Sequence, residues 1–142
     1  PYITPQIISA DDFFTTKDGK YVFNPRLLSR AHTETTTNAM SALKMGGDVI
    51  IANTFTNYWE ISPYIWMAQL AGADCIVYEP DFMNFIDLPF GEDGRHKIEN
   101  ELLERGTHGV PFKTIQNHID NFHRLEEGKL ISKVKHFNTG LL

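Results

Sequence analysis

Three short runs of apolar, mostly β-branched residues stand out along the chain. They cover residues 6–9 (Gln-Ile-Ile-Ser), 48–53 (Asp-Val-Ile-Ile-Ala-Asn) and 74–78 (Asp-Cys-Ile-Val-Tyr). Each run lies near glycine, proline, aspartate or asparagine, which is typical of a short strand bounded by turns. The apolar positions are nearly continuous and do not alternate, as expected for strands of a parallel sheet that is covered on both faces.

Three longer stretches have the features of helices. The first covers residues 24–45, where asparagine can cap the helix, Pro25 fits its first turn, and two glycines follow its end. We expect a second helix over residues 58–71, ended by Gly72, and a third over residues 110–124. Strands that alternate with helices predict an α/β fold, with a parallel sheet and flanking helices.

The remaining segments set the domain boundaries that we expect. Residues 82–90 are apolar and aromatic, and Gly-Glu-Asp-Gly at 91–94 predicts a turn. We therefore interpret residues 82–98 as an insertion or lid-like loop. A glycine ends the compact part, which predicts one domain over residues 1–128 and a C-terminal tail over residues 129–142 that forms a strand or an interface arm.

Composition and charge narrow the classes of protein. Hydrophobic residues make up 42% and aromatic residues 12% of the 142 positions, which supports a folded core and excludes wholesale disorder. The net charge of −5 excludes a globally basic nucleic-acid binder but not a local basic groove. Residues 1–94 carry 5 basic and 12 acidic side chains, a net −7, whereas residues 95–142 carry 8 and 6, a net +2. Either the C-terminal part meets anionic ligands or its charges form a solvated face.

Several functional classes leave no trace in the sequence. Cys75 is the single cysteine, which excludes a disulfide framework, and the histidines are too scattered to predict a metal site. No apolar run approaches the ~18 residues of a membrane span, and the N-terminal residues lack the pattern of a signal peptide. A Walker A sequence, G-x-x-x-x-G-K-[ST], is absent. We expect a cytoplasmic protein without membrane partners.

Two adjacent carboxylates, those of Asp11 and Asp12, follow the first predicted strand. Ligands of parallel α/β sheets bind beyond the carboxyl ends of the strands. A carboxylate at that edge can serve as general base for a hydroxyl group, while its neighbour supports the loop or contacts a metal. The alternative is that the pair caps a helix or forms a turn, as aspartate often does after a strand.

Three further residues, in two parts of the chain, offer polar contacts to a ligand. Asn53 and Thr54 end the second predicted strand, where they can bind substrate, hold a catalytic aspartate or cap a loop. Arg105 precedes a glycine-rich turn, where it can act as a mobile clamp for an anion or be a surface arginine at a helix end.

A series of short segments, taken in chain order, forms a combination that is far more specific than any one of its parts. The segments are Ile-Ser-Ala-Asp-Asp-Phe-Phe (8–14), Asp-Gly-Lys-Tyr-Val-Phe-Asn-Pro (18–25), Ala31-His32, Val-Ile-Ile-Ala-Asn-Thr (49–54), Trp59-Glu60, Pro63-Tyr64, Met67-Ala68, Glu79-Pro80-Asp81 and Arg-Gly-Thr-His-Gly-Val-Pro (105–111). Together they resemble the P-loop kinase-like, AAA-type ATP-binding domain of the NEDD-ligase-binding protein group, which is related to phage polynucleotide 5′-kinases. The resemblance extends over roughly residues 6–124.

This resemblance implies ATP-dependent phosphoryl transfer to the 5′-hydroxyl of a nucleic acid, with ATP and Mg²⁺ as cofactors. By its place in the matching motif, Asp11 would be the general base that takes the hydroxyl proton. Arg105 matches the last arginine of the lid motif and would stabilise charge on the phosphate. The positions that support the substrate or its loops match Asp12, Asn53, Thr54 and His108.

Departures from the family pattern affect the activity that we expect. The family ends its strand with Asp-Asn-Thr-Asn and its lid with Arg-Arg-Asn, whereas this chain has Ala-Asn-Thr-Phe at 52–55 and Glu-Arg-Gly at 104–106. The stretch between residues 81 and 105 is longer than usual. The family's first strand, normally central in the sheet, and its P-loop would precede Pro1. We therefore expect a P-loop NTPase-like fold without these parts, and little or no kinase activity from this chain alone.

Three hypotheses on function follow. The chain is one piece of a nucleic-acid kinase whose P-loop lies upstream, or a catalytically degenerate relative that acts in binding or assembly. Under the second hypothesis, a homo-oligomer or a partner chain covers the exposed sheet edges. The third is an enzyme with rebuilt chemistry at Asp11 and Asp12, such as a phosphoesterase. Pro1 could be a mature N-terminus or a cleavage boundary.

Overall fold

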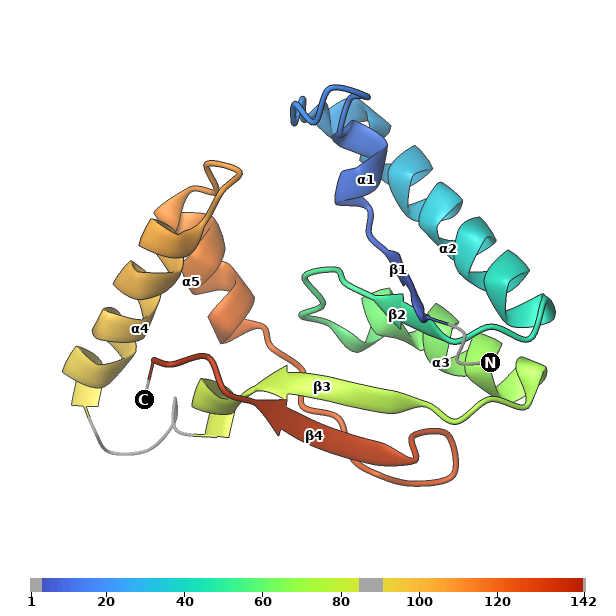
Figure 1. Ribbon diagram of the computed structural model, residues 1–142. Coiled ribbons are helices and arrows are strands. Elements are labelled where there is room, and N and C mark those ends of the chain that lie inside the picture. Colours follow the sequence, from blue (N-terminus) through green and yellow to red (C-terminus); the bar gives the residue numbers. More distant parts are fainter. Residues whose placement is uncertain (1–3, 85–90, 142) are drawn as a thin grey trace. The chain divides into compact units, whose positions relative to one another are not determined.

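The chain folds into two compact units, which we call unit 1 and unit 2. The computed structural model describes residues 4–84 and 91–141 (Figure 1). Unit 1 comprises the chain up to Phe55 together with Trp59–Asp74. Unit 2 comprises Thr56–Tyr58 and the chain from Cys75 onward.

Unit 1 is built on a parallel pair of short strands, β1 (Gln6–Ile8) and β2 (Val49–Ile51). The long helix α2 (Leu28–Lys44) contacts both strands. Residues four apart share one face of a helix, and the buried positions of α2 follow this spacing: Ala31, Thr35 and Ala39. Four threonines lie within α2, so tertiary packing and not intrinsic propensity stabilises this helix.

Shorter elements complete unit 1. Helix α1 (Asp11–Phe14) follows β1 after two residues. A 3-10 turn, η1 (Pro25–Leu27), leads into α2, and Asn24 caps it by accepting a hydrogen bond from the backbone N–H two residues later at 3.0 Å. Helix α3 (Tyr58–Ala71) belongs to this unit from its second residue onward.

Unit 2 is built on a second parallel pair of strands, β3 (Ile76–Pro80) and β4 (Lys133–Phe137). A 3-10 turn, η2 (Asp81–Asn84), follows β3, and helices α4 (Gly91–Arg105) and α5 (Phe112–Asp120) pack on each other. The apolar core of this unit contains Phe82, Met83 and Ile98, with Leu102, Phe122 and Leu141 packed against them.

Charged contacts join α4 to α5. The Arg95 guanidinium forms a 2.8 Å bond to the buried carboxylate of Glu99 and a second ion pair with Asp120 of α5. The amide of Gln116 donates to the same Glu99 carboxylate at 3.3 Å. The hydrogen bonds to Glu99 and Asp120 raise the pKa of Arg95, so the three charges stabilise one another.

Most predicted elements lie close to their predicted positions. The three predicted strands correspond to β1, β2 and β3, the first predicted helix to η1 with α2, and the second to α3. The mixed α/β class with parallel strands is confirmed. The third helix, α5, is shorter than predicted because it ends at Asp120. None of the described helices is long and apolar enough to cross a membrane.

Other expectations differ from the structure. The turn predicted at residues 91–94 is wrong, because these residues begin α4, where packing against α5 outweighs the low helix propensity of two glycines. In the described parts of the chain the strands form two two-stranded sheets and not one sheet. For the tail, by contrast, the strand that we gave as one of two alternatives is confirmed, because residues 133–137 form β4, which pairs with β3. Residues 85–90 of the expected insertion and Pro1 lie outside the described residues.

Candidate functional site

The two adjacent aspartates are the first residues of α1, at the junction with β1; we call residues 9–12, which form this junction, the Asp11 loop. The carboxylate of Asp12 accepts a hydrogen bond from the Ser9 N–H at 3.1 Å, and the Ser9 hydroxyl accepts one from the Asp11 N–H at 3.2 Å. This exchange resembles the reciprocal bonds of a helix capping box. The Asp12 carboxylate therefore bonds to its own loop, and both aspartates are exposed.

Asn53 fixes the Asp11 loop from the carboxyl end of the neighbouring strand β2. Its side-chain oxygen accepts hydrogen bonds from the Ala10 N–H at 2.8 Å and from the Ser9 hydroxyl at 3.4 Å. The side-chain nitrogen of Asn53 is buried and has no hydrogen-bond partner among the described residues. The next residue, Thr54, is exposed. Asn53 thus holds together the ends of the two paired strands.

Tyr21 is a neighbour of Asp11 that the sequence did not single out for chemistry. Its hydroxyl donates to the Asp11 carboxylate at 3.3 Å. Burial raises the pKa of Tyr21, and the negative charge of Asp11 and the hydrogen bond to it raise that pKa further. The Tyr21 ring stacks on Phe23 at 6.4 Å and meets buried Phe14 edge-on at 6.3 Å.

A sequence signal for Tyr21 does exist. Asp18-Gly19 is a turn dipeptide, and Gly19 has a φ of +82°, a conformation that glycine adopts easily. The turn reverses the chain, so that Thr15 and Tyr21 form an antiparallel bridge beside α1. A hairpin-like turn placed directly after the Asp11 loop was therefore the clue that this tyrosine returns to it.

Arg105 and His108, the other predicted site residues, belong to unit 2. The Arg105 guanidinium donates to the Thr139 carbonyl at 2.6 Å and lies 3.9 Å from the Glu101 carboxylate. Thr139 in turn donates through its hydroxyl to Asp81 at 2.6 Å, which lowers the pKa of that carboxyl. His108 is exposed in the turn after α4. The structure brings Asp11, Asp12 and Asn53 together, and Arg105 has contacts of its own with the C-terminal segment.

A second polar cluster in unit 2 was not predicted. The Glu79 carboxylate of β3 is buried and lies 3.0 Å from the Arg124 guanidinium and 3.1 Å from the His136 ring on β4. Arg124 also donates to the Met83 carbonyl at 3.0 Å, and the Leu125 N–H approaches Glu79 at 3.4 Å. The chain after α5 and strand β4 thus converge on one buried carboxylate of β3, which joins these three segments of the fold.

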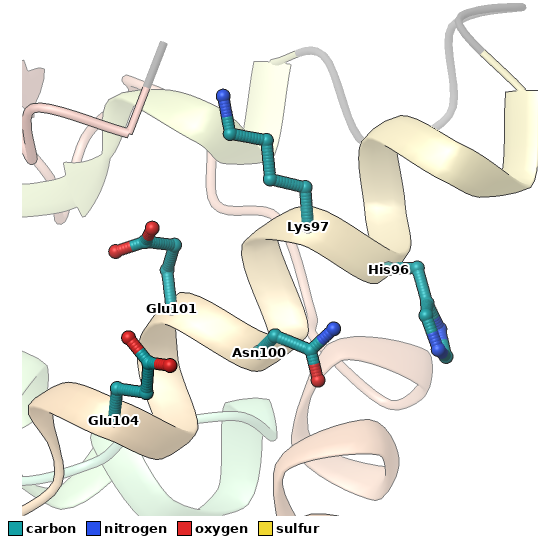
Figure 2. Close-up of a pocket in the computed structure, with 5 residues that line it drawn as sticks. All are labelled: His96, Lys97, Asn100, Glu101 and Glu104. Atoms are coloured by element: carbon teal, nitrogen blue, oxygen red, sulfur yellow. The ribbon is translucent and has the colours of Figure 1, made fainter.

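A shallow hollow on α4 offers no further site. Its lining comes from that one helix, and Figure 2 shows Lys97 and Glu101 on one side of the helix and His96 on another. The hollow is lined by His96, Lys97, Asn100, Glu101 and Glu104. In the part of the chain that the structure describes, no group of three or more His, Cys, Asp or Glu side chains could hold a metal ion.

Comparison with known proteins shows a similarity over most of the chain. No protein-family model matches the chain, and no solved structure matches it. The chain is 29% identical over 120 residues to NEDD4-binding protein 2 from Homo sapiens. The match covers 83% of this chain but spans only 6% of the length of that protein. Over most of its length the chain is therefore similar to a small part of NEDD4-binding protein 2, which supports a relation to that group.

Proposed function

We propose that this chain is the acceptor-side part of a polynucleotide 5′-hydroxyl kinase-like domain. The observation that carries the proposal is the exposed Asp11 carboxylate, on a loop that Asn53 fixes across the carboxyl ends of two parallel strands. The similarity to NEDD4-binding protein 2 and the family motifs around Asp11 support it.

In this proposal Asp11 acts on the acceptor hydroxyl. A general base must come within about 2.6–3.2 Å of the oxygen whose proton it takes. The proton would pass from the 5′-hydroxyl oxygen to the Asp11 carboxylate. That oxygen would bond to the γ-phosphorus of the ATP donor while the bond from this phosphorus to the leaving oxygen of ADP breaks. Tyr21 and Asn53 orient the carboxylate and its loop, while Asp12 bonds to the loop itself.

In this proposal the groups that bind the phosphate donor are not supplied by this chain. ATP and Mg²⁺ are the cofactors that the resemblance implies, but the 142 residues contain no Walker A sequence, and the described residues form no metal-binding cluster. The residues present therefore do not fit a triphosphate–metal site by themselves. We include in the proposal a P-loop NTPase-like sheet that a strand from outside this chain completes.

Arg105 has a place in the same proposal. Half of its side chain is exposed, and one of its nitrogens is bonded to the Thr139 carbonyl. Arginine presents five N–H donors, so its remaining donors can meet phosphate oxygens without loss of that bond. We assign to it stabilisation of phosphate charge, and to Thr54 and His108 the support of the substrate or its loops.

A binding experiment tests the acceptor site without any phosphate donor. A short single-stranded oligonucleotide with a 5′-hydroxyl should bind more tightly than the same oligonucleotide with a 5′-phosphate. The reason is that the carboxylates of Asp11 and Asp12 repel the phosphate dianion. The repulsion between two unit charges 4 Å apart in water is about 1 kcal/mol, which corresponds to about a fivefold change in the dissociation constant. Asp11→Asn should narrow this preference, while Asp18→Asn, at an exposed turn, should leave it unchanged. Equal binding of both ends, or a preference that survives Asp11→Asn, would overturn the proposal.

A catalytic experiment tests whether this chain supplies only the acceptor side of the reaction. The chain alone, assayed with Mg²⁺-ATP and a 5′-hydroxyl oligonucleotide, should transfer no phosphate and should show no saturable ATP binding by calorimetry. When a polypeptide with the Walker A sequence is supplied, Asp11→Asn should lower kcat by about 10²–10⁴-fold. Saturable ATP binding by the isolated chain would contradict the assignment of the donor side to other groups.

A second candidate function is assembly, as a catalytically degenerate relative. Three apolar side chains on one side of α3 are strongly exposed: Trp59 by 72%, Trp66 by 52% and Leu70 by 80%. Their spacing of seven and four residues places them in one stripe, which a second copy or a partner chain would cover. Trp66→Ser should then reduce the mass of the particle in sedimentation velocity. The name of the similar protein says that it binds NEDD4. Because the similar segment is only 6% of that protein, we do not propose NEDD4 as a partner of this chain.

A further inference from the structure

One face of the β3–β4 pair combines aromatic and basic side chains. The strands are parallel, and the register places Ile76 opposite Lys133, Tyr78 opposite Lys135, and Pro80 opposite Phe137. Because side chains alternate between the two faces of a strand, these positions share one face. We call the six residues the aromatic–lysine face; they are Ile76, Tyr78, Pro80, Lys133, Lys135 and Phe137.

The aromatic–lysine face is the accessible one. Tyr78 is 60% exposed and Phe137 is 45% exposed, whereas Val77 and Glu79, which point the other way, are buried. The Lys135 ammonium lies 6.0 Å from the centre of the Tyr78 ring, within the range of a cation–π contact. The sheet therefore directs its buried acid to one side and its rings and ammonium groups to the other.

The charge on this face has a single sign. Two of the six residues are lysines and none is acidic. The Glu127 carboxylate accepts a hydrogen bond from the Val134 N–H at 3.0 Å, which places it at the edge of β4 and not on the face. The imidazole and guanidinium of His136 and Arg124 lie against Glu79 on the opposite side. A polyanion would therefore meet only positive charge on the aromatic–lysine face.

We propose that the aromatic–lysine face binds single-stranded nucleic acid. Bases stack on the exposed rings of Tyr78 and Phe137, and the ammonium groups of Lys133 and Lys135 contact backbone phosphates. The two rings stand two residues apart along the strands and one strand apart, or about 8 Å, so two bases can stack side by side. Single strands are required because the bases of a duplex are already stacked on each other.

This site is distinct from the acceptor site proposed above and does not depend on phosphoryl transfer. It lies on β3 and β4 of unit 2, whereas Asp11 lies in unit 1. It would bind nucleotides within the nucleic-acid strand, so its affinity should not depend on whether the 5′ end carries a hydroxyl or a phosphate. A test without ATP, with an oligonucleotide whose ends are both blocked, therefore separates the two proposals.

The test is fluorescence anisotropy of an end-blocked deoxythymidine decamer with the full 142-residue chain. Removal of one stacking ring, by Tyr78→Ala or Phe137→Ala, should weaken binding about tenfold. Tyr78→Phe keeps the ring and should bind like the parent chain. If Lys133 and Lys135 neutralise two phosphates, the logarithm of the association constant should fall with the logarithm of the salt concentration with a slope of about −1.4. Lys135→Ala should reduce that slope to about −0.7.

Matched variants elsewhere show whether the effect belongs to this face. Tyr58→Ala removes an aromatic ring that is 39% exposed at the start of α3, outside the stripe of Trp59, Trp66 and Leu70. Lys44→Ala removes an exposed charge at the end of α2. Neither should change the affinity or the salt slope. Circular dichroism of every variant should match that of the parent chain, since the altered side chains are largely exposed.

Three outcomes would overturn the proposal. One is the absence of saturable binding to the decamer at low salt. Another is an equal loss of affinity in Tyr78→Ala and in Tyr58→Ala. The third is a Tyr78→Ala chain that binds the decamer normally but dissociates from an oligomer in sedimentation velocity, which would make this face an interface between copies of the chain.

Discussion

Two carboxylates, one in each unit, show how differently this molecule uses the same chemical group. Asp11 in unit 1 is exposed and accepts a hydrogen bond from the neutral Tyr21 hydroxyl. Glu79 in unit 2 is 2% exposed and lies within 3.1 Å of both a guanidinium and an imidazole. Asp11 is accessible to a ligand, whereas Glu79 is enclosed by its own fold.

The difference follows from the cost of burying charge. A carboxylate that leaves water loses its hydration, and the loss is offset only by close cations and hydrogen bonds. Glu79 meets this requirement with partners from two other segments, so it fixes β3 to β4 and to the chain after α5. Asp11 remains in water, so it has no such requirement and can take part in chemistry. Substitutions should therefore separate stability from ligand binding.

The largest effect is expected at Glu79. Glu79→Gln should lower the free energy of unfolding by about 2–4 kcal/mol, because Arg124 and His136 lose the charge that they face. The midpoint of urea unfolding measures this loss. Glu126→Gln, at an exposed position of the same unit, should change stability by less than about 0.5 kcal/mol. An equally small change at Glu79 would contradict the structural role assigned to it.

The next effect concerns the residue that fixes the Asp11 loop. Asn53→Ala should lower the free energy of unfolding by about 1–3 kcal/mol, because the Ala10 N–H loses its 2.8 Å acceptor. Thr54→Ala is the matched control, since that side chain is exposed. Thermal unfolding compares the two variants. A loss of similar size in both would mean that Asn53 does not hold the loop through this bond.

A smaller effect is expected at Asp11, and it depends on pH. Asp11→Asn should change stability at neutral pH by less than about 1 kcal/mol, because the carboxylate is exposed. The same change should lower the pKa of Tyr21 toward its ordinary value, although burial keeps that pKa raised. Absorbance titration near 295 nm measures this shift, and the Tyr21→Phe chain identifies the signal.

The sign of the pH effect at Tyr21 follows from the direction of its shift. A pKa that is higher in the folded than in the unfolded chain gives stability that is fully present below the unfolded value, about 10. That stability is lost as the pH rises through the folded pKa. In the Asp11→Asn chain this loss should be smaller. A Tyr21 pKa that does not move would contradict the contact between the two side chains.

The smallest effect is expected at the anchor of Arg105. Thr139→Val removes the hydroxyl that donates to Asp81, so the pKa of Asp81 should rise toward its ordinary value. Because a lowered pKa gives stability that is lost as the pH falls, the variant should show a weaker loss of stability below about pH 4. Carboxyl titration by NMR measures the shift. Thr139→Ser keeps the hydroxyl and should leave the Asp81 pKa low.

The sequence predicted the elements that depend on local patterns. The β-branched runs located β1, β2 and β3, and the asparagine–proline start located η1 and α2, because these signals lie within a few residues of each other. The same local reading predicted a turn at residues 91–94 and was wrong there. The ion pair of Arg95 with Asp120, which lies 25 residues away, is one of the contacts that hold α4 on α5.

For the candidate site, too, the sequence predicted what depends on local patterns and missed what depends on tertiary contacts. That Asp11 and Asp12 follow a strand could be read directly, and so could Asn53 at the end of the next strand. That the Asp12 carboxylate bonds to its own loop while the Asp11 carboxylate accepts a hydrogen bond from Tyr21 could not be read, since adjacent side chains diverge according to the turn that they make. Tyr21 was missed because its approach to Asp11 depends on the chain reversal at Gly19.

The amino-acid sequence by itself determined the α/β class, most strands and helices, and the position of two aspartates after a strand, because propensity, capping and turn chemistry act over a few residues. Only the tertiary structure decided which carboxylate is buried with cations and which is exposed. It also decided that β4 pairs with β3, where Glu79 and His136 meet across 57 residues of chain. Such contacts leave no local pattern, because they arise from burial and charge pairing between segments that are distant in sequence.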